Sequence, residues 1–341
     1  MHPDVFSNSV FTMRSLTAAI NDAPFVPGRL GELGLFVEKP IATTTAMIEK
    51  KNNGLYLVRA ADRGAPAQQN QASLRDAIPL KAVHLPVEDR LLADELQNVR
   101  AFGSENQLEG IQMKVDEKIA EMARSLEATK EHLRIGAIKG KVLDADGSKV
   151  LYDLFNVFDI DAPAEVDFNL DDHVGNADYK ITGAVRKKCS QVIRQIEDAL
   201  GSTPYTGVHS FVSAQFMDDL VDHPECREAY QRWLDGQALR DQSARRTFFY
   251  AGITFEEYRG KVGDVSYIAD HKAHFFPVGV PDLFHMVYAP ANWIETSNTL
   301  GLPLYAKPTP DPKGRWIDID AQSNPLPYCT RPRVLVPGKR T

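Results

Sequence analysis

Residues 104–139, SENQLEGIQMKVDEKIAEMARSLEATKEHLRIGAIK, are the stretch that decides the fold. Ser104 and Gln107 form a capping-box pattern at its start, and Gly140 follows its end. Apolar residues recur three or four positions apart, the spacing of one helix face: Leu108, Ile111, Val115, Ile119, Met122, Leu126, Leu133 and Ile138. The pattern predicts a helix about 50 Å long, a strut rather than a core helix. The alternative is a helix that breaks at one of its two glycines.

Ahead of this helix the chain offers few local hydrophobic partners. Residues 1–45 hold one short apolar-periodic piece, Leu16–Ile20, followed by spaced Pro and Gly residues that favour an extended arm. The remaining apolar residues of this arm include Phe11, Phe25 and Phe36. Because so few partners lie nearby in the sequence, we expect another subunit to bury them.

Residues 46–90 predict a long β-hairpin with a polar tip. From Lys39 to Lys81 the chain has seven Lys and Arg residues and three acidic residues, a local charge of +4. An isolated hairpin is marginally stable in water. We therefore expect this hairpin to lie across a neighbouring chain.

The rest of the sequence indicates a mixed α+β class. Asp146-Gly147 between two apolar runs is a hairpin signal, and the spacing lacks the terminal Glu of a calcium loop. Helices are predicted over residues 178–200, 216–220 and 225–234. The predicted strands are 208–212, 247–253, 265–268, 273–278, 283–289, 314–319 and 333–336.

Residues 151–179 carry the strongest charge signal, with eight acidic residues and no Lys or Arg. One interpretation is a solvated face; the other is a surface that repels phosphate, so that nearby nucleic acid stays mobile. The tail from Arg331 to Arg340 has four bases and no acids, and it either pairs with an acidic neighbour or is solvated. The acidic face is defined by Asp159, Asp161, Glu165, Asp167, Asp171 and Asp172.

Composition excludes several classes of protein. The 341 residues have a net charge of -7, which argues against a basic nucleic-acid coat. Cys189, Cys226 and Cys329 are odd in number and far apart, so no disulfide framework is expected. No run of 18 apolar residues predicts a membrane span, and the first 20 residues do not resemble a signal peptide.

Candidate catalytic or metal-binding residues are sparse. His271, His274 and His285 lack a carboxylate to complete a metal site, and a three-residue offset on a strand points side chains to opposite faces. Cys226 lies in the first turn of a predicted helix, where the dipole would lower the thiol pKa, but no orienting residue or oxyanion hole accompanies it. The sequence predicts no cofactor, no metal and no enzyme. A metal- or thiol-dependent hydrolase that uses these residues remains the alternative of another class.

A series of short motifs, in order along nearly the whole chain, resembles the lambda-like major capsid protein E family of tailed bacteriophages. The motifs are Leu16-Thr-Ala-Ala-Ile20, Val26-Pro-Gly-Arg-Leu-Gly-Glu-Leu-Gly-Leu-Phe36, Arg63-Gly-Ala-Pro66, Val99-Arg-Ala-Phe-Gly103, Gly136-Ala-Ile-Lys-Gly140, Leu143-Asp-Ala-Asp-Gly147, Gly301-Leu-Pro-Leu-Tyr-Ala-Lys307, Gln322-Ser-Asn-Pro-Leu-Pro-Tyr-Cys329 and Arg331-Pro-Arg-Val-Leu-Val336.

The resemblance implies an α+β fold of the Hong Kong 97-like phage capsid type, with an N-terminal arm, an extended loop, a long spine helix, and peripheral and axial domains. Carried over by position, its parts are an arm 1–45, an extended loop 46–90, a peripheral domain 91–154 with the spine helix 104–139, an axial domain 155–290, returning peripheral strands 291–330, and a C-terminal axial segment 331–341.

The resemblance also implies a function and partners. The chain would be a virion capsid protein, synthesised in the host bacterial cytoplasm, that assembles with itself as hexamers and pentamers of an icosahedral shell. The shell would enclose double-stranded DNA without sequence-specific binding or a membrane. A portal, a separate scaffolding protein and, as an open alternative, a decoration protein would be partners. The scaffold is expected to be separate because the arm motif starts within the first 20 residues.

Arm and loop residues are the expected contacts between subunits: Phe25, Arg29, Phe36, Lys50, Lys51, Arg59, Arg63 and Arg75. A non-viral shell with the same fold, such as an encapsulating compartment or a gene-transfer particle, is the alternative within this class.

Overall fold

The computed structural model describes residues 11–22, 28–51, 75–95, 107–172, 181–240, 246–262 and 265–341. The chain divides into two compact units, each assembled from segments that are far apart in the sequence. The first unit comprises Met1–Ala46, Pro79–Arg134 and Phe284–Pro327, and the second comprises Met47–Ile78, Ile135–Leu283 and Tyr328–Thr341. Among the described residues, no helix has both the length and the apolar character needed to cross a membrane.

The predicted long helix is confirmed as α3, Gln107–Lys139, which runs unbroken for 33 residues through both of its glycines. It ends at Gly140, whose φ of +79° favours glycine, and a Cβ there would overlap the ring of Phe155. Ser104, the predicted cap, lies outside the described residues. The predicted apolar stripe is buried at Ile111, Val115, Ile119, Met122, Leu126, Leu133 and Ile138.

The first unit contains an antiparallel sheet with the strand order β15-β16-β4. Its strands are β4 (Leu85–Leu92), β15 (Tyr305–Pro310) and β16 (Trp316–Ser323). Helix α1, Met13–Asp22, packs along β15, and its apolar residues share one hydrophobic core with this sheet and α3. That core holds the first unit together.

A second three-stranded sheet has the order β1-β14-β17. Its strands are β1 (Phe36–Pro40), β14 (Phe284–Tyr288) and β17 (Pro325–Cys329), with β1 parallel to β14. The short helix α2, Arg29–Glu32, precedes β1, and a 3₁₀ turn, η3 (Ile294–Thr296), follows β14.

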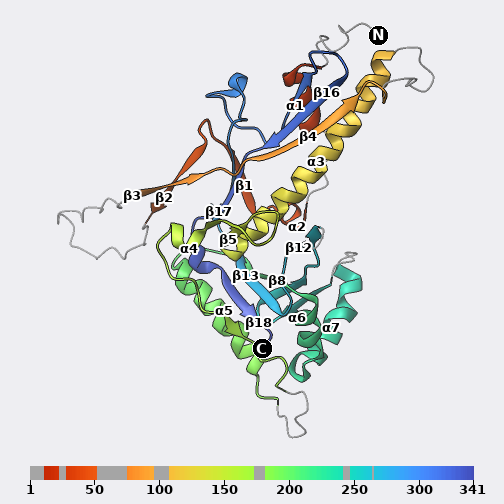
Figure 1. The fold of residues 1–341 in the computed structure, drawn as a ribbon. Coiled ribbons are helices and arrows are strands. Elements are labelled where there is room, and N and C mark those ends of the chain that lie inside the picture. The colour runs from red at the N-terminus through yellow and green to blue at the C-terminus, as the bar shows by residue number, and fades with distance from the viewer. Residues whose placement is uncertain are drawn as a thin grey trace, which may run out of the picture. The chain divides into compact units, whose positions relative to one another are not determined.

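The second unit is organised by a six-stranded mixed sheet of order β7-β18-β13-β8-β10-β9. Helix α5 packs along β7, β18 and β13, whereas α6 and α7 pack along β10 and β9 (Figure 1). Phe168, Phe216, Phe255 and Phe275 are buried in its aromatic core, with ring centroids 5.4 to 6.5 Å apart. The elements are β7 (Val166–Asp167), α5 (Ala184–Leu200), β8 (Gly207–Val212), α6 (Ala214–Asp222), α7 (Pro224–Arg240), β9 (Thr247–Tyr250), β10 (Ile253–Glu257), β13 (Lys272–Val278) and β18 (Val336–Lys339).

Shorter elements complete the described chain. They are the two-stranded ribbon β2 (Thr45–Lys51) and β3 (Arg75–Lys81), the hairpin β5 (Lys141–Leu143) and β6 (Val150–Asp153), the helix α4 (Leu154–Val157), the pair β11 (Lys261–Val262) and β12 (Val265–Ser266), and the 3₁₀ turn η4 (Pro332–Val334).

The Asp146-Gly147 hairpin is confirmed, with Gly147 at a φ of +70° and the Asp146 carboxylate accepting hydrogen bonds from two following backbone N–H groups. Two strand predictions are wrong in part. Residues 247–253 are two strands rather than one, because Ala251 and Gly252 turn the chain at positive φ. Residues 333–336 begin as the 3₁₀ turn η4, and β18 starts only at Val336.

Candidate functional site

The root of the predicted arm lies in the core of its own chain. Phe11 is 2% exposed and shares the core of the first unit with Leu16 and Ile20 on α1. The expectation that another subunit must bury the arm's apolar residues is therefore wrong for Phe11. It failed because its partners on α3 and β15 are about 100 or more positions away in the sequence, where local pattern gives no information.

Two charged side chains of α3, Glu131 and Arg134, are buried where the next part of the arm crosses it. The Glu131 carboxylate accepts a 2.7 Å hydrogen bond from the backbone N–H of Leu30 in α2. Arg134 donates to Glu38 on β1 at 3.0 Å, and the Tyr288 hydroxyl donates to the same carboxylate oxygen at 3.0 Å. Charge-assisted hydrogen bonds of this kind are stronger than neutral ones. They hold α2 and β1 on α3, and we call Glu131, Arg134 and Glu38 the arm clamp.

Lys130, the residue before Glu131 on α3, is a further buried charged side chain. Its ammonium pairs with Glu127 and lies 5.4 Å from the centroid of the Tyr288 ring. Burial lowers the pKa of Lys130, while the nearby Glu127 carboxylate opposes that shift. Sequence reasoning missed Lys130, Glu131 and Arg134. The burial of Lys130 could have been predicted, because it lies four residues after Leu126 and therefore on the apolar face of the helix.

The predicted inter-subunit contacts are distributed over several elements. Arg29 pairs with Glu32 at 3.3 Å within α2, and the ring of Phe36 packs 5.3 Å from that of Phe284. Lys50 and Lys51 lie on β2, and Arg75 begins β3. Phe25, Arg59 and Arg63 lie outside the described residues. The role of all eight residues as contacts between subunits stays a prediction.

The acidic face lies in the second unit, and part of its charge is neutralised within the chain. Glu165 pairs with Lys272 at 2.7 Å, and Asp167 pairs with Lys339 at 2.8 Å. Burial works to raise the pKa of Asp167, but hydrogen bonds from Lys339 and from the Asn169 backbone leave that pKa lowered.

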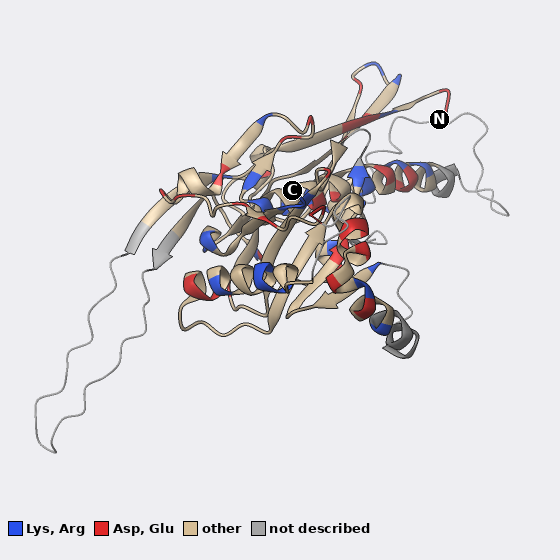
Figure 2. Cartoon of the chain, turned by 90° about the horizontal axis from the view of Figure 1, so that it is seen from below, with Lys and Arg blue, Asp and Glu red and all other residues tan. Residues whose placement is uncertain are grey.

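Two of the four bases in the tail pair with acids of their own chain, and a third, Arg331, donates to the Leu200 carbonyl and the Thr203 hydroxyl instead. Lys339 pairs with Asp167, and Arg340 pairs with Asp219. Asp172 lies 3.3 Å from the His223 ring, whereas Asp159, Asp161 and Asp171 are exposed and have no ion pair with any described residue. In Figure 2, Lys and Arg (blue) and Asp and Glu (red) are drawn on helices, strands and loops of the described chain.

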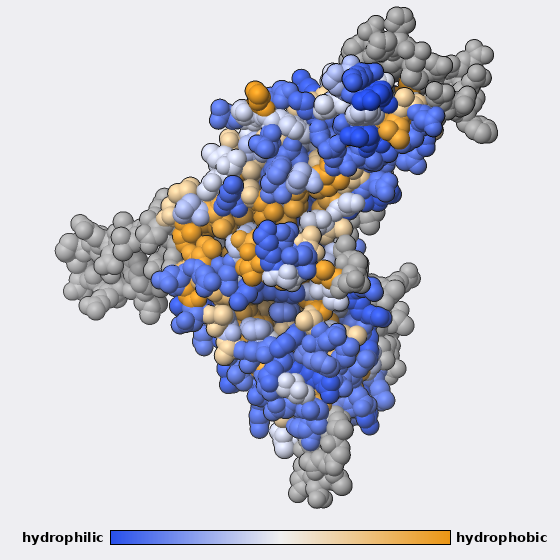
Figure 3. Space-filling model, in the orientation of Figure 1, coloured by the Kyte–Doolittle hydropathy of each residue, from blue (hydrophilic) through white to orange (hydrophobic). Residues whose placement is uncertain are grey.

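A surface that sequence reasoning missed lies in the loop after β14 in the first unit. Ile294 is 93% exposed, and Leu300 and Leu302 are 63% and 42% exposed. Single exposed apolar residues are ordinary, but three of them lie within nine positions of the chain, a concentration that favours contact with another protein. Figure 3 shows apolar residues, in orange, at the surface among polar ones. We call Ile294, Leu300 and Leu302 the apolar loop.

The residues of the hydrolase alternative do not form a site. His271 lies in an exposed turn at a φ of +64°, His274 lies on β13, and His285 lies on β14 in the other unit. No group of three or more potential metal-binding residues occurs among the described residues. The expectation of a lowered thiol pKa at Cys226 is wrong, because burial raises that pKa to about 12.

Comparisons with known proteins identify the family. The model of the family described as phage major capsid protein E matches residues 12–340. The chain belongs to this family. It is 30% identical to the major capsid protein of Salmonella phage Felix O1, covering 96% of both chains, and 26% identical to that of Pseudomonas phage KPP10, covering 99% of both. Membership of the major capsid protein E family makes the chain a structural protein that associates with itself.

A solved structure supports the fold. The crystal structure of a protein described as a prophage capsid protein from E. coli CFT073 matches with a TM-score of 0.56 at 12% identity, covering 97% of this chain and 99% of that one. The expected α+β fold of Hong Kong 97-like capsid type is thereby confirmed. In this major capsid protein E family member, most of residues 155–290 and all of 331–341 fall in the second unit.

Proposed function

We propose that this chain is the major capsid protein of a tailed phage and assembles as hexamers and pentamers into an icosahedral shell around double-stranded DNA. The observation that carries the proposal is the family match over residues 12–340, together with relatives named major capsid protein that align over almost their whole length. These relatives favour a phage shell over a non-viral compartment.

In this proposal the chain acts through assembly. The segments proposed for this function are the arm in 1–45, the extended loop in 46–90 and the axial domain in 155–290. The arm clamp supports this assignment, because a segment that reaches toward a neighbour needs a firm root in its own subunit. Glu131, Arg134 and Glu38 would supply that root. Many weak contacts between copies then add up through multivalency.

The β2–β3 ribbon and the apolar loop are the surfaces that we assign to contacts between copies. A two-stranded ribbon is marginally stable by itself, which favours a stabilising neighbour. Three exposed apolar side chains within nine positions of the chain favour burial in an interface. Each copy would therefore gain stability from its neighbours by mass action.

The exposed acids Asp159, Asp161 and Asp171 are proposed to face enclosed DNA or to line contacts within a hexamer or pentamer. Carboxylates without basic partners repel phosphate, so packaged DNA would not bind tightly to this surface. The other proposed partners are a portal, a separate scaffolding protein and a decoration protein. Synthesis is assigned to the cytoplasm of the bacterial host.

Electron microscopy tests the proposal. When the chain is produced together with its scaffolding protein, closed particles of uniform size are the expected result. A lone monomer under all assembly conditions would contradict a shell function.

A further inference from the structure

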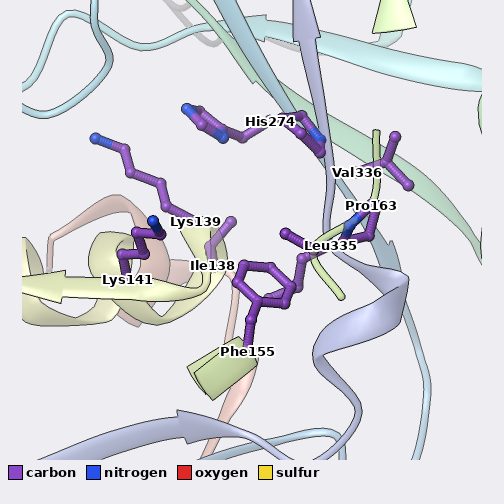
Figure 4. Close-up of a pocket in the computed structure, with 10 residues that line it drawn as sticks. Ile138, Lys139, Lys141, Phe155, Pro163, His274, Leu335 and Val336 are labelled. Carbon is purple, nitrogen blue, oxygen red and sulfur yellow. The ribbon is translucent and has the colours of Figure 1, made fainter. Parts of the chain in front are cut away.

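A cavity of about 200 Å³ lies in the second unit, where α3 ends and the chain turns into β5 (Figure 4). This volume is below the roughly 300 Å³ at which sites for drug-sized ligands begin, so it suits a small group. The lining residues come from α3, β5, α4, β13, β18 and the loops beside them: Ile138, Lys139, Lys141, Phe155, Ala162, Pro163, His274, Leu335, Val336 and Pro337.

Most of the cavity wall is apolar, and its ionisable groups are all bases. Phe155, Leu335 and Pro163 lie together on one side in Figure 4, and the side chains of Lys139 and His274 lie on the other. No Asp or Glu lines the cavity. An apolar chamber with a cationic side is complementary to a group that is anionic at one end and apolar at the other.

Lys139 and His274 form few hydrogen bonds with other described residues. The Lys139 ammonium donates one hydrogen bond, to the backbone carbonyl of Tyr267. No described residue forms a hydrogen bond with the His274 ring, which Figure 4 shows beside the Lys139 side chain. Lys141 is less available, because its ammonium pairs with Asp153 at 3.2 Å. The cavity therefore offers one main cation and one uncommitted imidazole.

The pKa values of these groups agree with an environment short of negative charge. Burial, followed by the positive charges of Lys139 and Lys272, lowers the pKa of His274 to about 3. Burial lowers the pKa of Lys139 to about 8. At pH 7 the ammonium is thus mostly charged, and the imidazole is neutral with one N–H to donate. An anion placed between them could pair with the ammonium and accept a hydrogen bond from the imidazole N–H.

We propose that this cavity binds a carboxylate carried on a short apolar body, with the carboxylate between Lys139 and His274 and the apolar body against Phe155 and Leu335. A single charge is favoured over phosphate because only Lys139 has an ammonium without an acidic partner in the wall. The carboxylate has two sources with the same chemistry, a free small acid or an acidic group of another polypeptide.

The experiment uses 4-fluorobenzoate as the probe and follows its binding to the unassembled protein at pH 7 by fluorine NMR. We expect saturable binding that weakens roughly tenfold or more in Lys139→Gln and in His274→Leu, since each loses a hydrogen bond to a charged group. Lys149→Gln is the matched control, because Lys149 lies in the β5–β6 hairpin that directly follows α3, is exposed and pairs with Asp144. Its affinity should equal that of the parent protein.

Lys139→Arg keeps the positive charge and should retain binding, which separates lost recognition from lost folding. The proposal would be overturned if no saturable binding occurred, or if Lys139→Gln and His274→Leu bound the probe as tightly as the parent protein. Preferential displacement of the probe by inorganic phosphate would also overturn it. Repeating the titration on assembled shells distinguishes the sources. Exclusion of the probe indicates a polypeptide carboxylate, and continued binding indicates a free acid. Because the first titration needs no assembly, its failure would leave the shell function intact.

Discussion

The carboxylate of Glu131 on α3 accepts a hydrogen bond of 2.7 Å from the backbone N–H of Leu30, and both residues are at most 3% exposed. This contact joins positions 101 residues apart. A buried carboxylate is costly unless its hydrogen bonds are satisfied, so the contact matters to the fold as well as to the arm. The close approach also explains Gly28, where a Cβ would overlap the Glu131 side chain.

Replacing Glu131 with Ala should destabilise the first unit by about 1–3 kcal/mol, because the buried N–H of Leu30 loses its acceptor. Urea unfolding followed by circular dichroism measures the effect. Glu117→Ala is the matched control, since Glu117 lies on the same helix, is 66% exposed and pairs only with Lys114 among the described ion pairs. It should change the free energy of unfolding by less than about 0.5 kcal/mol. Equal effects in the two variants would show that the clamp does not hold the arm.

Stability should fall as the pH rises above 9, because buried thiols resist ionisation. Burial raises the pKa of Cys226 and of Cys329 to about 12 from an ordinary value of 9.0. Between pH 9 and 12 the unfolded thiols lose protons that the folded ones keep, so unfolding becomes more favourable. Urea midpoints at pH 8 and pH 10 measure this. The double variant Cys226→Ala, Cys329→Ala should show a smaller decrease, and an unchanged decrease would refute the thiol origin.

The apolar loop should matter for assembly more than for folding. Ile294→Ser with Leu300→Ser removes two exposed apolar side chains, so the free energy of unfolding should change by less than about 0.5 kcal/mol. Shell yield, measured by sedimentation, should fall several-fold if these residues are buried between copies. Ile294→Val, which keeps the apolar surface, should assemble normally. Full yield from the double serine variant would remove this loop from the interface.

Deleting residues 59–75 should block shell formation while the axial domain, residues 155–290, remains folded, because the deletion removes only the central part of the predicted extended loop 46–90. Circular dichroism and protease resistance report on folding, and electron microscopy reports on shells. Intact shells of normal size from this variant would refute the assignment of residues 46–90 as an essential loop between copies.

Local pattern predicted the parts of the fold that depend on near neighbours in the sequence. The spacing of Ile111, Val115 and Ile119 specified α3, and Asp146-Gly147 specified the β5–β6 hairpin. Pairing between distant segments could not be predicted in this way. The parallel pairing of β1 with β14 joins Phe36 to Phe284, and nothing near either residue encodes it.

For the candidate site, the sequence likewise identified charged segments but not the distant residues that pair with them. The acidic segment stood out by composition, but its partial neutralisation by Lys272 and Lys339 depends on the strand order β7-β18-β13, which no local pattern encodes. No local pattern around Glu131 indicates its hydrogen bond with the Leu30 N–H, because the two residues are 101 positions apart. The prediction for Cys226 was wrong because it considered only the helix position, which lowers a thiol pKa. Burial has the larger effect and raises the pKa.

The most direct test of the central claim is a cryo-electron microscopy reconstruction of particles formed by this chain with its scaffolding protein. We predict a closed icosahedral shell of hexamers and pentamers, with residues 46–90 lying on an adjacent copy and Asp159, Asp161 and Asp171 facing the lumen or the contacts within a capsomer. Particles without icosahedral symmetry, or a chain that stays monomeric throughout, would contradict it.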